Sequence, residues 1–277
     1  MWCFLNGEWM DMADAKLAIN DLGIQRGYGV FDFFRVMNNA PLFIDDHLVR
    51  LQRSASVMHL QHGYSSEEFK TIVNELIHKN QMPSSGIRIT ITGGYTTDSY
   101  SISQPNIIIT QTPVVMQDDF SQNKAFRLIT HNYVRDLPSV KSINYMMGVW
   151  LQPVVKAAGA DDVLYVKNNF ISELPRSNIF IITKQGMLIT PNEQVLKGVT
   201  RKNILQAASS IMQVKERAVS LEELHDAEEV FISATTKRVI PVVEVDGKMT
   251  GDGKPGKRTA AIFELLLQKE KQSTGCE

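Results

Sequence analysis

The stretch SVKSINYMMGVW, residues 139–150, places one lysine at the start of a run of apolar and uncharged side chains. Lys141 has no acidic neighbour within this stretch, and the residues after it predict a helix from about Ile143. A lysine between Val140 and an apolar helix can point toward the protein interior. A buried ammonium is costly, so such a lysine indicates chemistry, although a lysine head in solvent at a helix start is the commoner case.

The residues before this stretch predict an α+β unit. Two strand-like segments, CFLNGEW and GVFDFFRVMNN, come first. Apolar residues at helical spacing then predict helices in DDHLVRLQRSASVMHL and SSEEFKTIVNELIHKN, and GIRITITGG and PNIIITQTP predict two more strands. The unit is expected to end near Val115. The polar segment MQDDFSQNK, residues 116–124, has no periodicity and is predicted to be a linker.

The residues after the linker predict a second, larger domain. Strands are expected in DDVLYVK, SNIFIITK, MLITP and EEVFISA, and helices from Thr200 and in RTAAIFELLLQKEK. The glycine-rich stretch DGKMTGDGKPG matches no phosphate-binding loop and is interpreted as a turn before the last helix. The expected organisation is a small N-terminal domain of residues 1–115, a linker of residues 116–124 and a large C-terminal domain of residues 125–277.

Composition and charge favour small-molecule partners in the cytoplasm. With 43% hydrophobic and 21% charged residues the chain has an ordinary globular composition. It has 29 Lys and Arg against 30 Asp and Glu, so no basic field for nucleic acid or a membrane is expected. Cys3 and Cys276 form no spaced motif, which fits a reducing compartment, and no apolar run reaches membrane-spanning length. His59 and His62 lack an acidic or cysteine partner nearby, so no metal site is expected.

Several other motifs carry residues that could bind an anion or a cofactor. Glu173 in ISELPRSNIF precedes a turn and a strand. Val199 and Thr200 in VLKGVTRKNIL open a helix, where free N–H groups and the helix dipole favour an anion. Further candidate ligands are Thr235 and Thr236 in FISATTKRVIPV and Arg50 in DDHLVRLQ. Each alone also fits an ordinary surface carboxylate, helix cap or surface arginine.

Together, HLVRL, KSINY, ELPRSNIF, LKGVTR and SATTKRVIPV resemble, in order, the motifs of the fold type IV pyridoxal phosphate enzymes, the class IV aminotransferases. The resemblance spans most of the chain. It implies a two-domain α+β fold, with a small α/β domain and a larger domain that has a β-barrel-like core and flanking helices. It also implies pyridoxal 5'-phosphate as cofactor and ping-pong transfer of an amino group between an amino acid and a 2-keto acid.

The resemblance also assigns roles to residues. Lys141 is expected to condense with the cofactor's aldehyde, and Glu173 to hydrogen-bond the pyridine nitrogen. The other cofactor-binding residues that it implies are Arg50, Val199, Thr200 and Thr235 at the phosphate, Tyr145 at the phenolic oxygen and Leu196 against one ring face. The implied substrate-binding residues are Arg26, Phe31, Arg88, Thr236 and Lys237.

Departures from the family patterns bear on the substrate. Phe33 stands where aminodeoxychorismate lyases typically carry threonine. Gly93, between Thr92 and Gly94, stands where D-amino acid aminotransferases usually have the arginine of a TRG motif. Branched-chain enzymes usually show GTAAE where this chain reads ATTKR. The cations Arg26, Arg88 and Lys237 resemble instead a less usual group of D-amino acid aminotransferases, in which two arginines and a lysine bind substrate carboxylates.

D-amino acid donors are therefore favoured, and a branched-chain L-amino acid aminotransferase is the alternative. An aminodeoxychorismate lyase or a non-catalytic relative that binds the cofactor is less favoured, since both Lys141 and Glu173 are retained. The resemblance implies a homodimer, because in the family the loop from Arg26 to Phe31 comes from the other subunit. Arg176, inside the glutamate motif, receives no role.

Overall fold

The computed structural model describes residues 1–274, which fold into two compact units. Unit one contains Met1–Val115 and Val140–Asn144, and unit two contains Met116–Ser139 and Tyr145–Gln272. The segment that carries Lys141 therefore belongs to unit one, whereas the sequence grouped it with residues 125–277. Within the described part of the chain, no helix combines the length and the apolar character needed to cross a membrane.

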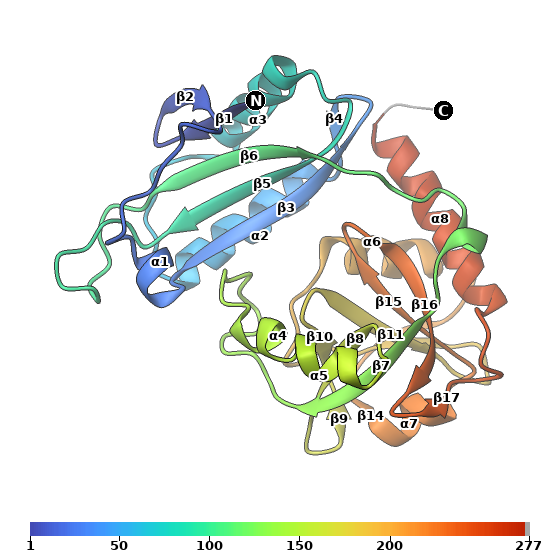
Figure 1. Ribbon diagram of the computed structural model, residues 1–277. Coiled ribbons are helices and arrows are strands. Elements are labelled where there is room, and N and C mark those ends of the chain that lie inside the picture. Colours follow the sequence, from blue (N-terminus) through green and yellow to red (C-terminus); the bar gives the residue numbers. More distant parts are fainter. Residues whose placement is uncertain (275–277) are drawn as a thin grey trace. The chain divides into compact units, whose positions relative to one another are not determined.

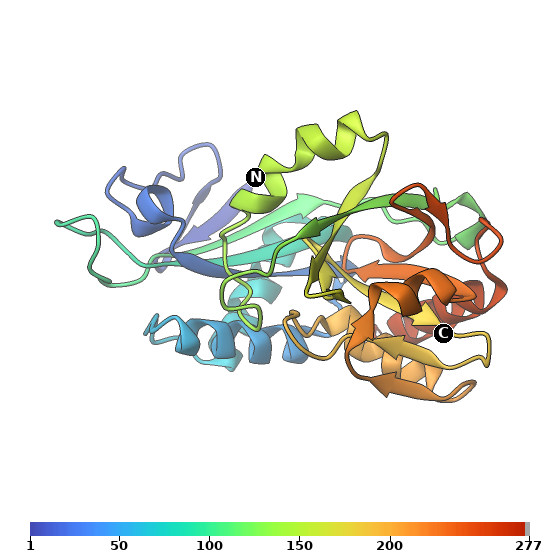
Figure 2. The same cartoon turned by 90° about the horizontal axis from the view of Figure 1, so that it is seen from below.

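Unit one is a six-stranded sheet with two long helices along one face, as Figure 1 and Figure 2 show. The strand order is β2-β1-β6-β5-β3-β4. The strands are β1 (Trp2–Leu5), β2 (Glu8–Asp11), β3 (Gly29–Met37), β4 (Ala40–Pro41), β5 (Ser84–Thr92) and β6 (Ile107–Pro113). The helices are α1 (Leu22–Arg26), α2 (Ile44–Val57) and α3 (Ser66–Asn80). The two helices and the central strands predicted for this region are confirmed, and CFLNGEW proves to be the hairpin of β1 and β2.

The helices and the sheet of unit one are fixed by local sequence signals. Ser65 and Glu68 form a reciprocal capping box at the start of α3, which satisfies N–H groups that the helix leaves unpaired. Along β5, Ile87, Ile89 and Ile91 alternate toward one face and are fully buried. These isoleucines join the apolar faces of α2 and α3 in one core. Apolar residues at every second position of the strand therefore pack against apolar residues at about every fourth position of the helices.

The Lys141 segment pairs with β3 and is extended. The Phe31 N–H donates to the Lys141 carbonyl at 2.9 Å, and the Ile143 N–H donates to the Gly29 carbonyl at 3.0 Å. Because this pairing holds the segment in a strand-like conformation, the next helix begins only at Met146. The prediction of a helix from about Ile143 was wrong at its start for this reason.

Unit two is built on an eleven-stranded sheet with the path β13-β12-β11-β15-β16-β7-β8-β9-β14, where β10 also pairs with β11 and β17 with β16. The strands are β7 (Phe126–Asn132), β8 (Asp162–Lys167), β9 (Phe170–Ile171), β10 (Glu173–Leu174), β11 (Ser177–Ile182), β12 (Leu188–Thr190), β13 (Val214–Glu216), β14 (Val219–Ser220), β15 (Glu229–Ala234), β16 (Arg238–Val245) and β17 (Lys248–Met249). The helices are η1 (Phe120–Gln122), α4 (Met146–Trp150), α5 (Gln152–Ala157), α6 (Val199–Ala208), α7 (Leu221–Asp226) and α8 (Lys257–Ser273).

Helices α6 and α8 cover part of this sheet. Ile204 of α6 and Phe263 of α8 are fully buried in one core with Phe180 and Phe231, whose rings stack with centroids 4.7 Å apart. The predicted turn in DGKMTGDGKPG is confirmed, because Asp246 and Gly247 join β16 to β17 and the rest of the stretch leads to α8. Residues 116–124, predicted as a linker, are tied to this unit by the buried Arg238, whose Nη1 donates to the carbonyl of Gln117 at 2.6 Å.

Candidate active site

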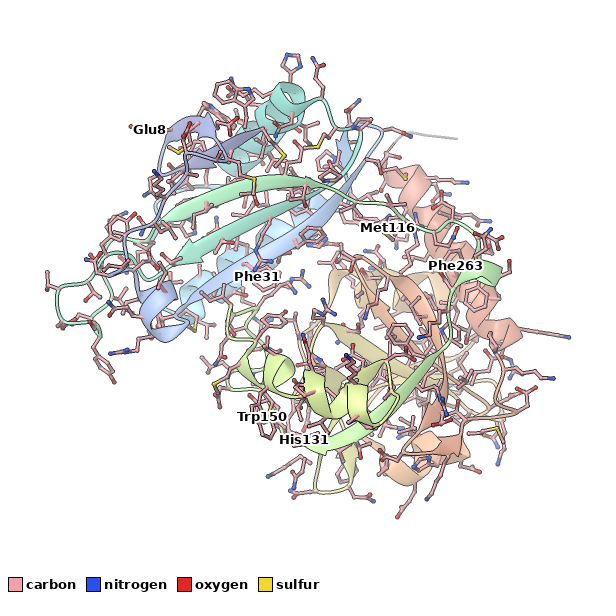
Figure 3. The ribbon with its side chains drawn as sticks, viewed as in Figure 1. Glu8, Phe31, Met116, His131, Trp150 and Phe263 are labelled. Carbon is pink, nitrogen blue, oxygen red and sulfur yellow. The ribbon has the colours of Figure 1, made fainter. Side chains whose placement is uncertain are left out.

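Lys141 lies beside the ring of Phe31 on β3. Its N–H donates to Ser54 Oγ at 3.2 Å, and its Nζ lies 4.7 Å from the centroid of the Phe31 ring. Figure 3 labels Phe31 on this strand, and 6% of this residue is exposed. Lys141 itself is half-buried rather than fully enclosed. The segment's pairing with β3 therefore fixes the backbone of Lys141, while part of the residue stays exposed.

Arg88 of β5 contacts the same aromatic ring. Its Cζ lies 3.9 Å from the centroid of Phe31, and its Nε donates to Thr90 Oγ1 at 3.3 Å. Unit one thus brings Lys141, Phe31 and Arg88 together. Arg26 differs, since it is exposed at the end of α1 and its Nη1 donates to the carbonyl of Gln25 at 2.9 Å. Within residues 1–274, Arg26 makes no hydrogen bond or ring contact with Lys141 or Arg88.

A buried charge network surrounds Arg50. Its Nε and Nη2 donate to the two oxygens of Asp32 at 2.8 Å each, and the Nδ1 of His47 lies 2.7 Å from Asp32 Oδ1. Burial alone would raise the pKa of Asp32, but the neighbouring Arg50 and His47 outweigh it and hold that pKa well below its usual range. Burial lowers the pKa of His47, and the positive charges of Arg50 and Lys141 lower it further against the opposing pull of Asp32.

This network leaves one side of Arg50 available. Nη1 makes no hydrogen bond to another residue of the described chain, and the side chain is 11% exposed. A buried guanidinium with unused donors is suited to a phosphate. Sequence reasoning missed Asp32 and His47, although an aspartate within the strand GVFDFFRV, at a position that is fully buried, required a cationic partner.

In unit two, Glu173 is held from two sides. Its Oε1 accepts a hydrogen bond from Arg135 Nε at 2.6 Å, and its Oε2 accepts one from the Leu196 N–H at 2.8 Å. The side chains of Arg135 and Glu173 are 15% and 5% exposed. Arg135 also donates to the carbonyl of Pro138 at 2.6 Å. The sequence did not single out Arg135, because nothing in its local pattern shows that it pairs with a carboxylate 38 residues away.

Polar side chains line up with Glu173 on one face of the sheet. Glu173 pairs with Asn178, and Asn178 pairs with Ser233, so all three lie on the same face across β10, β11 and β15. Asn178 Nδ2 donates to the Leu196 carbonyl at 2.8 Å. The Ser233 hydroxyl is buried and has no hydrogen-bond partner among residues 1–274. An unpartnered buried hydroxyl on the same sheet face as a buried carboxylate, with Asn178 between them, favours a site for a polar ligand.

Helix α6 begins beside this row without a side-chain cap. Gly198 precedes the helix, and no side chain caps the N–H groups that follow, which include those of Val199 and Thr200. A Cβ on Gly198 would lie 2.3 Å from Asn178 Oδ1, so only glycine allows this approach. The helix therefore presents free donors and the positive end of its dipole to an anion.

The loop between β15 and β16 carries three further candidates. Thr235, Thr236 and Lys237 connect the paired residues Ala234 and Arg238. Thr236 is exposed and Thr235 half-buried. Lys237 Nζ lies 3.6 Å from Asp162 Oδ2, and burial lowers the pKa of this lysine. Tyr145, at the start of α4, is half-buried.

The family model for amino-transferase class IV matches residues 29–245. The chain belongs to the class IV aminotransferases. It is therefore a pyridoxal phosphate-dependent transferase of mixed helix and sheet structure. The resemblance found in the five motifs is confirmed.

Relatives of this class IV aminotransferase carry two kinds of name. The D-alanine aminotransferase of Bacillus licheniformis is 29% identical over 272 residues, which cover 96% of either chain. A Methanocaldococcus jannaschii protein, named provisionally as a branched-chain-amino-acid aminotransferase, is 29% identical over 276 residues, with 95% of this chain and 94% of its own covered. The solved structure of a T.th. branched-chain amino acid aminotransferase with pyridoxamine 5'-phosphate has a TM-score of 0.90 and 22% identity, and the match covers 100% of this chain and 95% of that one.

The residues of this aminotransferase suit the cofactor of its family. In unit two, the uncapped N–H groups at α6 suit a phosphate dianion and the buried Glu173 carboxylate suits a protonated ring nitrogen. In unit one, the unused donors of Arg50 also suit a phosphate, and the amine of the half-buried Lys141 suits an aldehyde. Within residues 1–274, no three His, Cys, Asp or Glu side chains gather as a metal site.

Proposed function

We propose that this enzyme transfers amino groups from D-amino acids to 2-keto acids, with acidic donors such as D-glutamate among the best. The observation that supports this most is the pair of cations on one ring, with Arg88 Cζ at 3.9 Å and Lys141 Nζ at 4.7 Å from the centroid of Phe31. Two cations at one small aromatic ring favour an anionic ligand nearby, and a substrate carboxylate supplies one.

When bound, pyridoxal phosphate supplies an aldehyde that accepts the amino group and a ring that accepts electrons from the α-carbon. The chain's part is to hold and move protons. We assign to Lys141 the transfer of the proton from the substrate's α-carbon to the cofactor's C4' carbon. We assign to Glu173 the hydrogen bond that keeps the ring nitrogen protonated. Arg88 would hold the substrate so that its α-hydrogen faces Lys141.

The remaining cofactor contacts follow from the donors described above. The Nη1 of Arg50, the N–H groups of Val199 and Thr200 and the hydroxyl of Thr235 would bind the phosphate. Leu196 would pack against the ring. Tyr145 would hydrogen-bond the phenolic oxygen.

Substrate recognition is proposed to use Arg26, Arg88 and Lys237 for the carboxylates, with Phe31 and Thr236 beside them. The active form is proposed to be a cytoplasmic homodimer, in which Arg26 serves the site of the partner subunit. Large apolar side chains on α4 support a subunit interface, because Met146, Val149 and Trp150 are 72%, 61% and 63% exposed. Figure 3 labels Trp150 on this helix.

A branched-chain L-amino acid aminotransferase is the second candidate. It is favoured by the names of the M. jannaschii relative and of the solved T.th. structure. In such an enzyme the turn at Thr235 and Thr236 would bind the α-carboxylate, and the side chain of the substrate would need an apolar pocket. The two candidates therefore differ in whether the turn at Thr235 and Thr236 or the cations Arg26, Arg88 and Lys237 bind the α-carboxylate of the substrate.

Half-reaction rates of the holoenzyme with D-glutamate, D-alanine, L-glutamate and L-leucine separate these functions. We expect the two D-amino acids to react faster than either L-amino acid, and Arg88→Ala to slow both D-amino acids, because Arg88 is assigned to orienting the α-carbon that both share. A faster reaction with L-leucine than with either D-amino acid would establish the branched-chain enzyme instead.

A further inference from the structure

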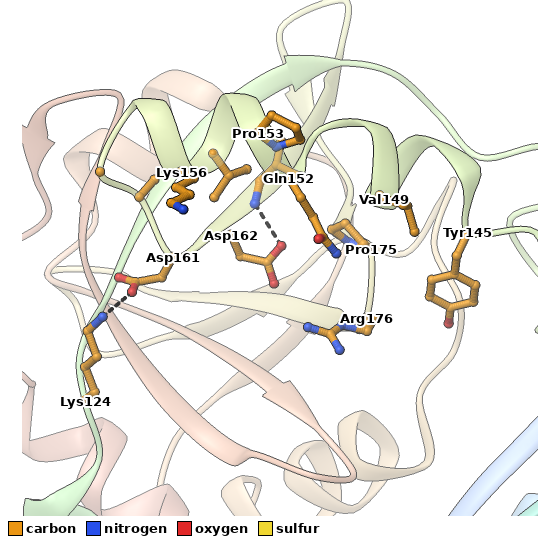
Figure 4. A pocket seen from close by; sticks show the side chains of 15 residues that line it. Lys124, Tyr145, Val149, Gln152, Pro153, Lys156, Asp161, Asp162, Pro175 and Arg176 are labelled. Atoms are coloured by element: carbon orange, nitrogen blue, oxygen red, sulfur yellow. Dashed lines mark hydrogen bonds and ion pairs between the residues drawn. The ribbon is translucent and has the colours of Figure 1, made fainter.

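Unit two contains a cavity of about 990 Å³ whose wall includes Arg176, the residue of the glutamate motif that has no role in the proposed mechanism. Figure 4 shows the cavity between the helices α4 and α5 and the start of β8. Its lining also includes Tyr145 and Asp162. In this view the guanidinium of Arg176 extends from its turn toward the side of the cavity that carries Asp162.

The turn that carries Arg176 is rigidly placed. Pro175 and Arg176 are the two residues between β10 and β11, where Leu174 pairs with Ser177. Proline fixes φ and so pre-forms the turn. Helix α4 packs directly on it, since a Cβ on Gly148 would lie 3.0 Å from Pro175 Cβ. The same hairpin carries Glu173 three residues earlier, so the backbone of Arg176 is held in a fixed relation to the backbone of the residue assigned to the ring nitrogen.

The charges around Arg176 are unbalanced. Arg176 is exposed and makes no hydrogen bond or ion pair with another described residue of the chain. Lys237 lies next to the same cavity, because its Nζ is 3.6 Å from Oδ2 of Asp162, which lines the cavity together with Arg176. Burial lowers the pKa of the Lys237 ammonium and the charge of Arg176 lowers it further, against the opposing effect of Asp162. The carboxylate of Asp161, which also lines the cavity, forms an ion pair with Lys124.

We propose that Arg176 and Lys237 form an anion subsite that binds the second carboxylate of a dicarboxylic substrate. The inference rests on the proposed function, in which the preferred donor is acidic and therefore carries a second carboxylate. An anion between two like charges relieves their repulsion, and the planar guanidinium can bind a carboxylate through two parallel hydrogen bonds. Because Pro175 and Gly148 hold the turn, little backbone entropy is lost when the anion binds.

Direct binding tests the subsite without turnover. Calorimetric titration of the holoenzyme with glutarate and with pentanoate compares two ligands of equal chain length that differ in one carboxylate. We expect wild type to bind glutarate at least tenfold more tightly, and Arg176→Met to lose about tenfold in glutarate affinity with no change for pentanoate. Arg176→Lys should keep part of the preference. Lys156→Met is the matched control, because Lys156 is an exposed cation on the same cavity.

Steady-state kinetics gives the second readout. In Arg176→Met we expect KM for 2-oxoglutarate to rise about tenfold while KM for pyruvate is unchanged. Unchanged glutarate affinity and unchanged KM in Arg176→Met, with a wild type that does react with D-glutamate, would overturn the subsite and leave the proposed function intact. A wild type that reacts with L-leucine and not with D-glutamate would overturn both.

Discussion

Replacement of Arg135 by methionine tests whether the ion pair with Glu173 holds the centre of unit two. The variant Arg135→Met keeps most of the side-chain volume and removes the charge 2.6 Å from Glu173 Oε1. Breaking a buried pair in this way costs about 3–5 kcal/mol, since the remaining charge is buried without a partner. Arg135 is 15% exposed and the Leu196 N–H still donates to Glu173, so we expect the lower end, about 3 kcal/mol.

The assay is thermal unfolding of the apoprotein, so that loss of cofactor binding does not enter. At about 2–4 °C per kcal/mol for a protein of this size, Tm should fall by about 6–12 °C. Arg127→Met is the matched control. Its pair with Glu244, at 2.7 Å, joins side chains that are 56% and 23% exposed, so no measurable change in Tm is expected.

The double variant Arg135→Met with Glu173→Gln sharpens the test. Glutamine removes the charge that Arg135→Met leaves unpaired, so the double variant should be more stable than Arg135→Met alone. If the double variant is the less stable of the two, or if Arg135→Met melts like wild type, the ion pair between Arg135 and Glu173 does not stabilise the fold by about 3 kcal/mol.

Three further outcomes are expected. Lys141→Ala should abolish transamination and the yellow colour of the holoenzyme; wild-type turnover without added amine would refute the role of Lys141. Mixing Lys141→Ala chains with Arg26→Ala chains should restore part of the activity, and no recovery despite proven subunit exchange would remove Arg26 from the partner's site. The folded pKa of Asp32 lies below its unfolded value of about 3.9, so its stabilisation is fully present above pH 3.9 and is lost as pH falls toward the folded pKa. The urea midpoint of Asp32→Asn should therefore depend less on pH between about pH 4 and pH 2 than that of wild type, and parallel profiles would contradict this.

The sequence by itself determined the elements whose signals are local. Three such signals are the alternating isoleucines of β5, the capping box of α3 and the helical spacing in α2. Each depends on residues within one turn or one strand, so it can be recognised without knowing which distant residues pack against it. The five motifs likewise determined the family, because their residues are contiguous and occur in order. These signals also singled out Lys141 and Glu173 as candidates.

Only the tertiary structure decided which groups meet across long stretches of chain. The Lys141 segment is extended because it pairs with backbone groups of β3, more than 100 residues earlier, whereas the apolar residues after Lys141 had predicted a helix from about Ile143. The pairing of Arg135 with Glu173, and of Asp32 with Arg50, depends on the fold bringing a buried carboxylate to a cation. A buried charge requires a partner, but the sequence does not state which one, because hydrogen bonding and Coulomb attraction depend on distance in space rather than along the chain.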